Sequence, residues 1–349
     1  MADTNVIIVG AGVAGLACAR ELARRGFASV VLERSRGVGG RCATRRIDGQ
    51  SVDHGAAFLH ARSAEFAEAL AQMPPEGRID GWPTRVVETR LACQPEAFAP
   101  GQTRLARRDG VNAFPKMLAH GLDVRLEHPV TQLESVGGRL RVHTQPGAIF
   151  ESEFVVVAGS LAQSLRLTEP FAAGFPGAAG QFARLHELEI VPSFAVIAGY
   201  ESSSPDPLFD LWNPLETVML QAIIHDSAKR ANPRHRVLVL HSRPGFARAR
   251  MSESPEAWSR DMLWELGDML GEWAAHPLWT QTHAWRSGRI RAGDQLAMPA
   301  VLNAPGGGTL LIIGDAFGTQ PGVEGAYLSG VAAGEQLARA PERLRLVGR

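Results

Sequence analysis

The first residues of this chain carry three glycines whose spacing suits the binding of phosphate groups. Gly10, Gly12 and Gly15 follow the β-branched run 6–9 and open a helical stretch, 16–25. In the pattern GxGxxG the first glycine allows a tight turn, the second lets the backbone approach a pyrophosphate, and the third lets helix and strand pack closely. The N–H groups at the helix start then face the phosphates. The alternative is a glycine-rich turn that binds nothing.

An acidic residue stands where a dinucleotide ribose would be recognised. Glu33 closes a second expected strand, 28–32, at about the 20-residue distance typical of this fingerprint. A carboxylate there accepts hydrogen bonds from ribose hydroxyls and favours a free 2′-OH over a 2′-phosphate. Strand, helix and acid together favour a dinucleotide site over the empty turn.

Later motifs favour FAD over NAD. Gly39-Gly40-Arg41 follows Glu33 closely, and Arg41 beside the phosphates has an obvious anionic partner. Near the C-terminus Gly314-Asp315 closes a strand, and Gly322-Val323-Glu324-Gly325 precedes a helix expected over 325–339. An aspartate there reaches ribityl or ribose hydroxyls, and a helix N-terminus stabilises the negative charge of a reduced flavin. A cofactor bound by both ends of the chain is long, as FAD is.

These motifs resemble the FAD-containing amine-oxidase superfamily and, within it, the renalase-like branch. The resemblance rests on segments 40–46, 53–58, 110–115 and 130–133, and on the shorter segments 239–242 and 283–286. It implies a p-hydroxybenzoate-hydroxylase-like fold and non-covalent FAD. The residues then expected to bind FAD are Gly10, Gly12, Gly15, Glu33, Arg34, Gly40, Arg41, Ala56, Val130, Gly314, Asp315, Val323 and Glu324.

The renalase-like branch implies a particular reaction. Isomeric dihydronicotinamides (2- or 6-dihydroNAD(P)) would pass a hydride to the flavin, and O2 would reoxidise it with release of H2O2. By position, Phe58, His241 and Trp285 fall where that branch lines the pocket near the flavin. From the residues alone, His241 and Trp285 could equally be structural, and Asp53 could stabilise a turn.

Two departures from the branch bear on the substrate. Phe58 stands where tyrosine is frequent, and Gly159-Ser160 replaces a proline-containing turn. An amine or lipophilic hydrocarbon substrate, or a non-catalytic FAD-binding module, therefore stays as an alternative. Classical amine oxidases have an aromatic residue where Gly322 stands, and a lysine near the flavin. Lys116 on a helix and Lys229 in a polar turn are both expected to be poorly placed for that role.

Composition excludes several other classes. Lys+Arg and Asp+Glu both number 36, which argues against a nucleic-acid binder. No apolar run reaches the roughly 18 residues of a membrane span, so none is expected. The three cysteines, which include no CxxC pair, are expected to be reduced thiols of a cytoplasmic protein. His225, Asp226, His235 and His241 fit no metal-ligand spacing, so no metal is expected.

The elements that must position these residues indicate an α/β protein. Buried strands are expected at 6–9, 28–32, 154–157 and 309–313, which predicts a Rossmann-like FAD-binding domain with an inserted α+β substrate domain. The expected bounds are 1–60, 104–165 and 300–349 for the FAD-binding domain, and 61–103 and 166–299 for the substrate domain. Within the latter we expect strands at 193–198 and 236–241, a helix at 255–275 and a loop at 170–180.

Overall fold

The computed structural model describes residues 6–145 and 147–339. Its contacts divide the chain into two compact units that the chain enters alternately. The first unit comprises 1–40, 114–190 and 289–349, and the second comprises 41–113 and 191–288. Each unit is therefore assembled from separate segments of the sequence.

The unit bounds differ from those of the expected domains for a reason visible in the packing. Residues 41–60 lie in the second unit, where Ile47 and Val52 share a hydrophobic core with Ile197 and Val239. Residues 166–190 lie in the first unit, since Phe182 packs in that unit's core. Apolar burial rather than chain continuity decides the division.

A mostly parallel sheet forms the centre of the first unit, with strand order β19-β20-β13-β1-β2-β9; β19 alone is antiparallel to its neighbour. A second sheet, β10-β11-β12, is antiparallel. The strands are β1 (Val6–Val9), β2 (Ser29–Leu32), β9 (Asp123–Arg125), β10 (Val130–Val136), β11 (Arg139–Thr144), β12 (Ile149–Ser152), β13 (Phe154–Val157), β19 (Ala300–Asn303) and β20 (Thr309–Ile312). The helices are α1 (Val13–Arg24), α3 (Ala113–Ala119), α4 (Leu161–Ala172), α5 (Ala178–His186) and α8 (Gly322–Ala338).

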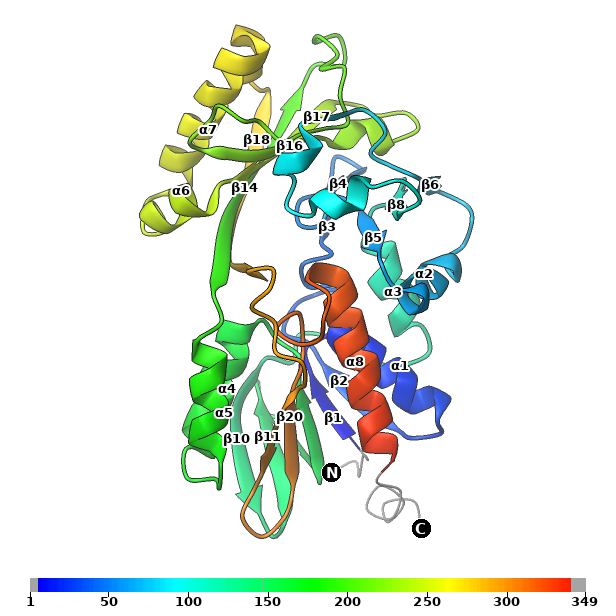
Figure 1. The fold of residues 1–349 in the computed structure, drawn as a ribbon, viewed down its shortest axis with the longest axis vertical. Helices are drawn as coiled ribbons and strands as arrows, with labels where there is room; N and C mark the ends of the chain where they lie inside the picture. Colours follow the sequence, from blue (N-terminus) through cyan, green and yellow to red (C-terminus); the bar gives the residue numbers. More distant parts are fainter. Residues whose placement is uncertain (1–5, 146, 340–349) are drawn as a thin grey trace. The chain divides into compact units, whose positions relative to one another are not determined.

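Both faces of the parallel sheet are covered, which explains its continuous hydrophobic strands. Alternate strand residues such as Ile7 and Val155 join a core with Leu133 of β10 and Leu165 of α4. Helices α1 and α8 lie side by side, as Figure 1 shows in blue and red. They approach so closely that a Cβ on Gly330 would lie 2.2 Å from the Ala14 carbonyl oxygen.

The second unit is built on a sheet of order β18-β14-β17-β16-β15-β7, with a hairpin β3-β4 and a small sheet β5-β8-β6. The strands are β3 (Thr44–Ile47), β4 (Gln50–Asp53), β5 (Leu59–Ala61), β6 (Arg78–Asp80), β7 (Val86–Val87), β8 (Thr103–Arg107), β14 (Ile190–Tyr200), β15 (Leu211–Trp212), β16 (Leu220–His225), β17 (Arg236–Ser242) and β18 (Trp279–Ile290). The helices are α2 (Ala64–Ala71), α6 (Pro244–Ala249) and α7 (Pro255–Leu270), with 3-10 turns η1 (Thr89–Leu91), η2 (Pro95–Phe98), η3 (Asp226–Lys229) and η4 (Glu272–Ala275).

Side-chain alternation divides the residues of this larger sheet between two cores. On one face Phe194 stacks on Trp258 of α7, with ring centroids 4.1 Å apart and planes at 8°. On the other face Ile197 and Val239 pack with the β3-β4 hairpin. The unit therefore has an α+β character, as expected.

Two expected elements are wrong in detail. The expected loop 170–180 is shorter, 173–177, and helical at both ends: α4 runs through Pro170 and ends at Ala172, and α5 starts at Ala178. A proline in the last turn removes only one helical hydrogen bond, and Phe171 and Phe182 pack on the first unit's core. The expected helix 255–275 stops at Leu270 because Gly271 has φ +100°; a 3-10 turn follows.

Candidate functional site

Each of the three N-terminal glycines has a different structural environment. Gly10 has φ +107°, and a Cβ there would lie 3.0 Å from the Ala158 carbonyl oxygen. A Cβ on Gly15 would lie 2.1 Å from the Gly10 oxygen, so this glycine permits close packing of turn and helix. A Cβ on Gly12 would meet no protein atom within 4 Å. The space beside Gly12 is thus open, which fits a position where a pyrophosphate approaches the backbone.

The open space lies at the N-terminus of α1. Gly12 is the N-cap and offers no side-chain cap, and the first turn has no acidic residue. The unpaired N–H groups of the first turn and the helix dipole favour an anion there. The Gly39 amide donates to the Ala11 carbonyl at 2.9 Å, and Gly40 lies beside Gly12. These residues form a cradle that fits the phosphates of a dinucleotide.

Glu33 supports this cradle directly. It is buried at the end of β2, and its carboxylate accepts hydrogen bonds from the Ala11 and Ser35 amides, both at 2.8 Å. The side chain therefore holds the glycine turn, a role that the sequence pattern did not indicate. A carboxylate has further lone pairs, so a hydrogen bond to a ribose hydroxyl stays a prediction. Arg34, the next residue, is exposed.

The C-terminal motif lies in the same unit. Gly314 has φ +140°, and its amide donates to the Ser329 hydroxyl of α8 at 3.2 Å. Asp315 is buried and accepts a hydrogen bond from the Ile290 amide at 3.3 Å. The helix begins at Gly322, earlier than the expected 325. Val323 and Glu324 therefore lie in its first turn, where the buried Glu324 carboxylate interacts favourably with the helix dipole.

Three other expected cofactor ligands belong to other segments of the fold. Val130 begins β10 in the first unit and pairs with Thr144. Arg41 and Ala56 belong to the second unit, where the Ala56 amide donates to the Arg41 carbonyl at 3.1 Å. The Arg41 guanidinium donates to the Gly288 carbonyl at 3.3 Å. Pairing of Arg41 with cofactor phosphates stays a prediction.

Two of the three expected catalytic residues meet in the second unit. The Trp285 indole donates to the His54 carbonyl at 3.0 Å, and the His241 Nε2 lies 3.3 Å from the same oxygen. Phe58 lies elsewhere in the unit and packs its ring on Trp82 and Phe98, each at 6.1 Å between centroids. The structure therefore joins His241 and Trp285 through His54 and leaves Phe58 in a separate aromatic cluster.

Imidazole rings surround Trp285. His54 stacks on it with centroids 5.4 Å apart and planes at 28°, and His283 lies 4.0 Å away. We call His54, His241, His283 and Trp285 the imidazole–indole cluster. Its charged neighbour is Arg45, whose guanidinium lies 3.5 Å from the His283 Nδ1.

Two imidazoles of this cluster, those of His54 and His283, are held neutral. Burial, followed by the Arg45 charge, lowers the pKa of His54 to about 3. The same two causes lower the pKa of His283. At neutral pH the cluster is an aromatic surface without an acidic group of its own, and Trp285, His241 and His283 are each half-buried.

Sequence reasoning missed a buried ionic network next to His54. Lys229 was expected in a polar turn, but it has no exposed surface and contacts Asp53 at 2.5 Å and Asp226 at 2.7 Å. Arg230 also contacts both aspartates. Lys229 further donates to the Ala57 carbonyl at 3.0 Å. The segment 53–57, which includes His54, is thus anchored by two cations.

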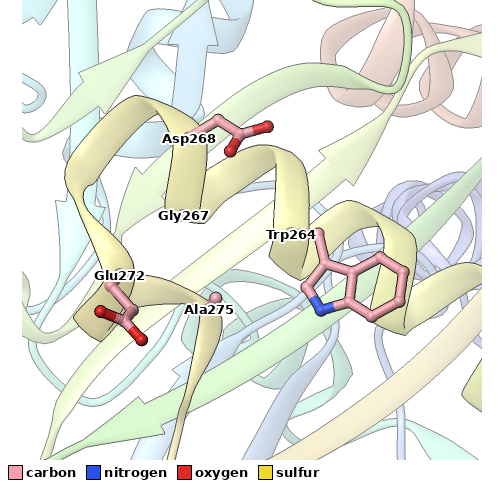
Figure 2. A pocket seen from close by; sticks show the side chains of 5 residues that line it. All are labelled: Trp264, Gly267, Asp268, Glu272 and Ala275. Carbon is pink, nitrogen blue, oxygen red and sulfur yellow. The ribbon is translucent and has the colours of Figure 1, made fainter.

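A surface depression in the second unit involves none of the expected site residues. It has a volume of about 300 Å³ and lies where α7 ends and η4 begins (Figure 2). Trp264, Asp268 and Glu272 line it, with Gly267 and Ala275 between them. We assign it no role.

Comparison with known proteins places the chain in a family. The NAD(P)-binding Rossmann-like domain profile matches residues 8–73, and the profile of flavin containing amine oxidoreductases matches residues 88–338. The chain belongs to the flavin-containing amine oxidoreductase family. At this level the expected flavin cofactor, oxidoreductase class and Rossmann-like α/β fold are confirmed.

Individual relatives match over short segments. Pseudooxynicotine dehydrogenase of Pseudomonas sp is 40% identical over 58 residues, 17% of this chain and 12% of that protein. The zeta-carotene-forming phytoene desaturase of Myxococcus xanthus is 48% identical over 51 residues, 15% of this chain and 10% of that protein. The matched segments are thus small parts of both relatives.

Likeness of fold extends over the whole chain. The structure of cyclohexylamine oxidase from Brevibacterium oxydans IH-35A covers 98% of this chain and 100% of its own, with a TM-score of 0.70 and 15% identity. Among the described residues, no helix is both long and apolar enough to cross a membrane.

Proposed function

We propose that this flavoprotein is a renalase-like oxidase of isomeric dihydronicotinamides (2- or 6-dihydroNAD(P)). When bound, FAD would supply the two-electron acceptor for the hydride, and O2 together with one proton from solvent would take up the two electrons as H2O2. The observation that carries the proposal is the imidazole–indole cluster, a half-buried aromatic surface in which His54 and His283 are neutral. Such a surface suits a flat, uncharged dihydropyridine ring.

The residues of the cluster suit a reaction without a strong base. A dihydronicotinamide becomes an aromatic cation as its hydride leaves, so no proton has to be removed. Positioning of the ring is then the main task of the protein. We propose that Trp285 stacks on this ring and that His241 and His54 orient its carboxamide.

Arg45 lies beside the cluster and opposes positive charge there, both on an ammonium substrate and on the nicotinamide cation that hydride loss produces, so this charge does not separate the two substrate classes. The family and its fold support a second candidate, oxidation of a small amine. A non-catalytic FAD-binding module is the third.

Turnover assays separate these candidates. We expect the FAD-loaded protein to release H2O2 with a mixture of dihydronicotinamide isomers, and none with benzylamine or cyclohexylamine. Trp285→Leu should raise KM for the isomers about two- to tenfold through lost stacking. Trp264→Leu removes an indole from the exposed face of α7 and should leave KM unchanged. Release with amines alone would favour the second candidate, and no release at all the third.

A further inference from the structure

Arg45 is a half-buried cation that has no carboxylate partner. It lies on β3 beside the imidazole–indole cluster, and burial lowers the pKa of its guanidinium. No carboxylate within 6–145 and 147–339 forms an ion pair with it to offset the loss of water. A cation that is partly removed from water gains from an anionic partner. Its position at a candidate active site therefore indicates a negatively charged group on the ligand.

The protein groups around Arg45 face it with their acceptor atoms. Arg45 donates to the Gln281 Oε1 at 2.9 Å and to the Thr282 carbonyl at 3.2 Å, and its Nη2 lies 3.5 Å from the His283 Nδ1. A guanidinium has no acceptor, so the Nδ1 that faces it is the acceptor nitrogen of the imidazole. The neutral His283 ring then carries its proton on Nε2.

Three side chains are thus left with N–H groups that lack an acceptor. The nitrogens are the Nε of Arg45, the Nε2 of Gln281 and the Nε2 of His283. None of them forms a hydrogen bond within the described residues, and none belongs to the buried polar atoms, so they remain open to solvent. A ligand that satisfies all three must offer several acceptor oxygens, and the charge of Arg45 favours an anion.

These donors lie next to the proposed stacking surface. Gln281, His283 and Trp285 share one face of β18, because side chains two residues apart point to the same side of a strand. The His283 and Trp285 rings lie 4.0 Å apart between centroids, and Gln281 follows on the side away from Trp285. In a nicotinamide nucleotide one ribose separates the ring from the phosphate. A ring stacked on Trp285 therefore places that phosphate within reach of Arg45.

We propose that Arg45, Gln281 and His283 bind the phosphate of a dihydronicotinamide nucleotide whose ring stacks on Trp285. This proposal rests on the proposed function and narrows its substrates to phosphorylated donors. It also removes a conflict of charge. Arg45 alone opposes the nicotinamide cation that hydride loss produces, whereas an arginine neutralised by the substrate's own phosphate does not.

Kinetics with matched donors test the proposal. The FAD-loaded protein is assayed with the 2- and 6-dihydro isomers of nicotinamide mononucleotide and of nicotinamide riboside, which differ only in the phosphate. We expect KM to be at least about tenfold lower for the nucleotides, with kcat equal within about twofold. Equal KM values for nucleotide and riboside would overturn the phosphate site and leave the oxidase activity standing.

Matched variants locate the site. Arg45→Gln should raise KM for the nucleotides about tenfold and change KM for the ribosides by less than about twofold. Arg46→Gln removes the same charge from an exposed neighbour, which donates to the Ser51 hydroxyl and the Asp109 carbonyl, and should change neither KM. Arg45→Lys should fall between wild type and Arg45→Gln, because it keeps the charge and loses the planar fork. Thermal unfolding confirms that each variant is folded. Equal effects of Arg45→Gln and Arg46→Gln would contradict the site.

Calorimetric titration with oxidised ligands separates this proposal from the proposed function. Nicotinamide mononucleotide should bind to the FAD-loaded wild type at least about tenfold more tightly than nicotinamide riboside, and Arg45→Gln should abolish the difference. The same difference in wild type and Arg45→Gln would overturn the proposal. The titration needs no turnover. Failure of every isomer to reduce the flavin would therefore contradict the oxidase activity, while the titration would still decide the phosphate site.

Discussion

Two cations and two carboxylates are buried together in the second unit. Asp53 accepts from Lys229, Arg230, the Thr44 hydroxyl and the Val111 amide. Burial alone would raise the pKa of Asp53, but Lys229 and Arg230 outweigh it and lower that pKa. Asp53 therefore stays ionised, and the energy of the network depends on all partners being present.

Removal of one partner should be costly. Lys229→Met leaves two buried aspartates facing only one cation, and we expect it to lower the free energy of unfolding by about 3–5 kcal/mol. Lys116→Met, which changes the exposed lysine on α3, should alter it by less than about 0.5 kcal/mol. Urea unfolding measures both variants. A loss below about 1 kcal/mol for Lys229→Met would show that the network does not need this charge.

His54 predicts a pH dependence of stability. Its pKa falls from an ordinary value near 6.5 to about 3 in the folded protein, so the unfolded chain binds the proton more readily. Stability from this group is thus full above pH 6.5 and declines as the pH falls towards 3, by at most about 1.4 kcal/mol per pH unit.

The comparison of wild type with His54→Phe isolates this contribution. Unfolding free energies at pH 7.5 and pH 5.5 should differ more in the wild type than in the variant. The same difference in both proteins would mean that the pKa of His54 is not lowered in the folded protein.

At the scale of elements, a substitution at the start of α1 should weaken cofactor binding without affecting folding. Gly12 has an ordinary φ of −74°, and its Cβ position is open, so Gly12→Ala should leave the stability of the apoprotein unchanged. The added methyl group would occupy the phosphate cradle and weaken FAD binding about tenfold or more. Flavin fluorescence titration measures this. Unchanged FAD affinity would place the cofactor phosphates elsewhere.

The contact between α1 and α8 makes a second prediction at this scale. In Gly330→Ala the new Cβ would lie 2.2 Å from the Ala14 carbonyl oxygen, and we expect a loss of about 1–3 kcal/mol in unfolding free energy. Gly180→Ala, in the open interior of α5, should be neutral or stabilise by up to about 1 kcal/mol. Equal effects of the two substitutions on thermal unfolding would contradict close packing of α1 on α8.

Elements that a short sequence pattern determines were predictable from the sequence. Strands β1 and β13 were predicted to the residue, because buried parallel strands are continuous β-branched runs. Pro170 misled the prediction, since tertiary contacts of α4 overrule the local preference. Lys229 could not be placed either: its partner Asp53 is 176 residues away, and no local pattern reports such a pair.

At the scale of the whole molecule, the residues expected to bind the cofactor and the residues proposed to bind the substrate belong to different units. The glycine cradle, Glu33 and Asp315 lie in the first unit, and the imidazole–indole cluster lies in the second. The glycine turn at the start of α1 was predictable because it depends on short spacing, and its binding of phosphates stays a prediction. The central role of His54 was not, because it follows from long-range contacts with residues 241 and 285.

Anaerobic stopped-flow absorbance of the FAD-loaded protein tests the central claim most directly. The protein is mixed with dihydronicotinamide isomers, and separately with benzylamine, while the oxidised-flavin band is followed. We predict rapid bleaching by the isomers and none by benzylamine. Bleaching by benzylamine alone, or an oxidised-flavin band that neither donor bleaches, would contradict the proposed function.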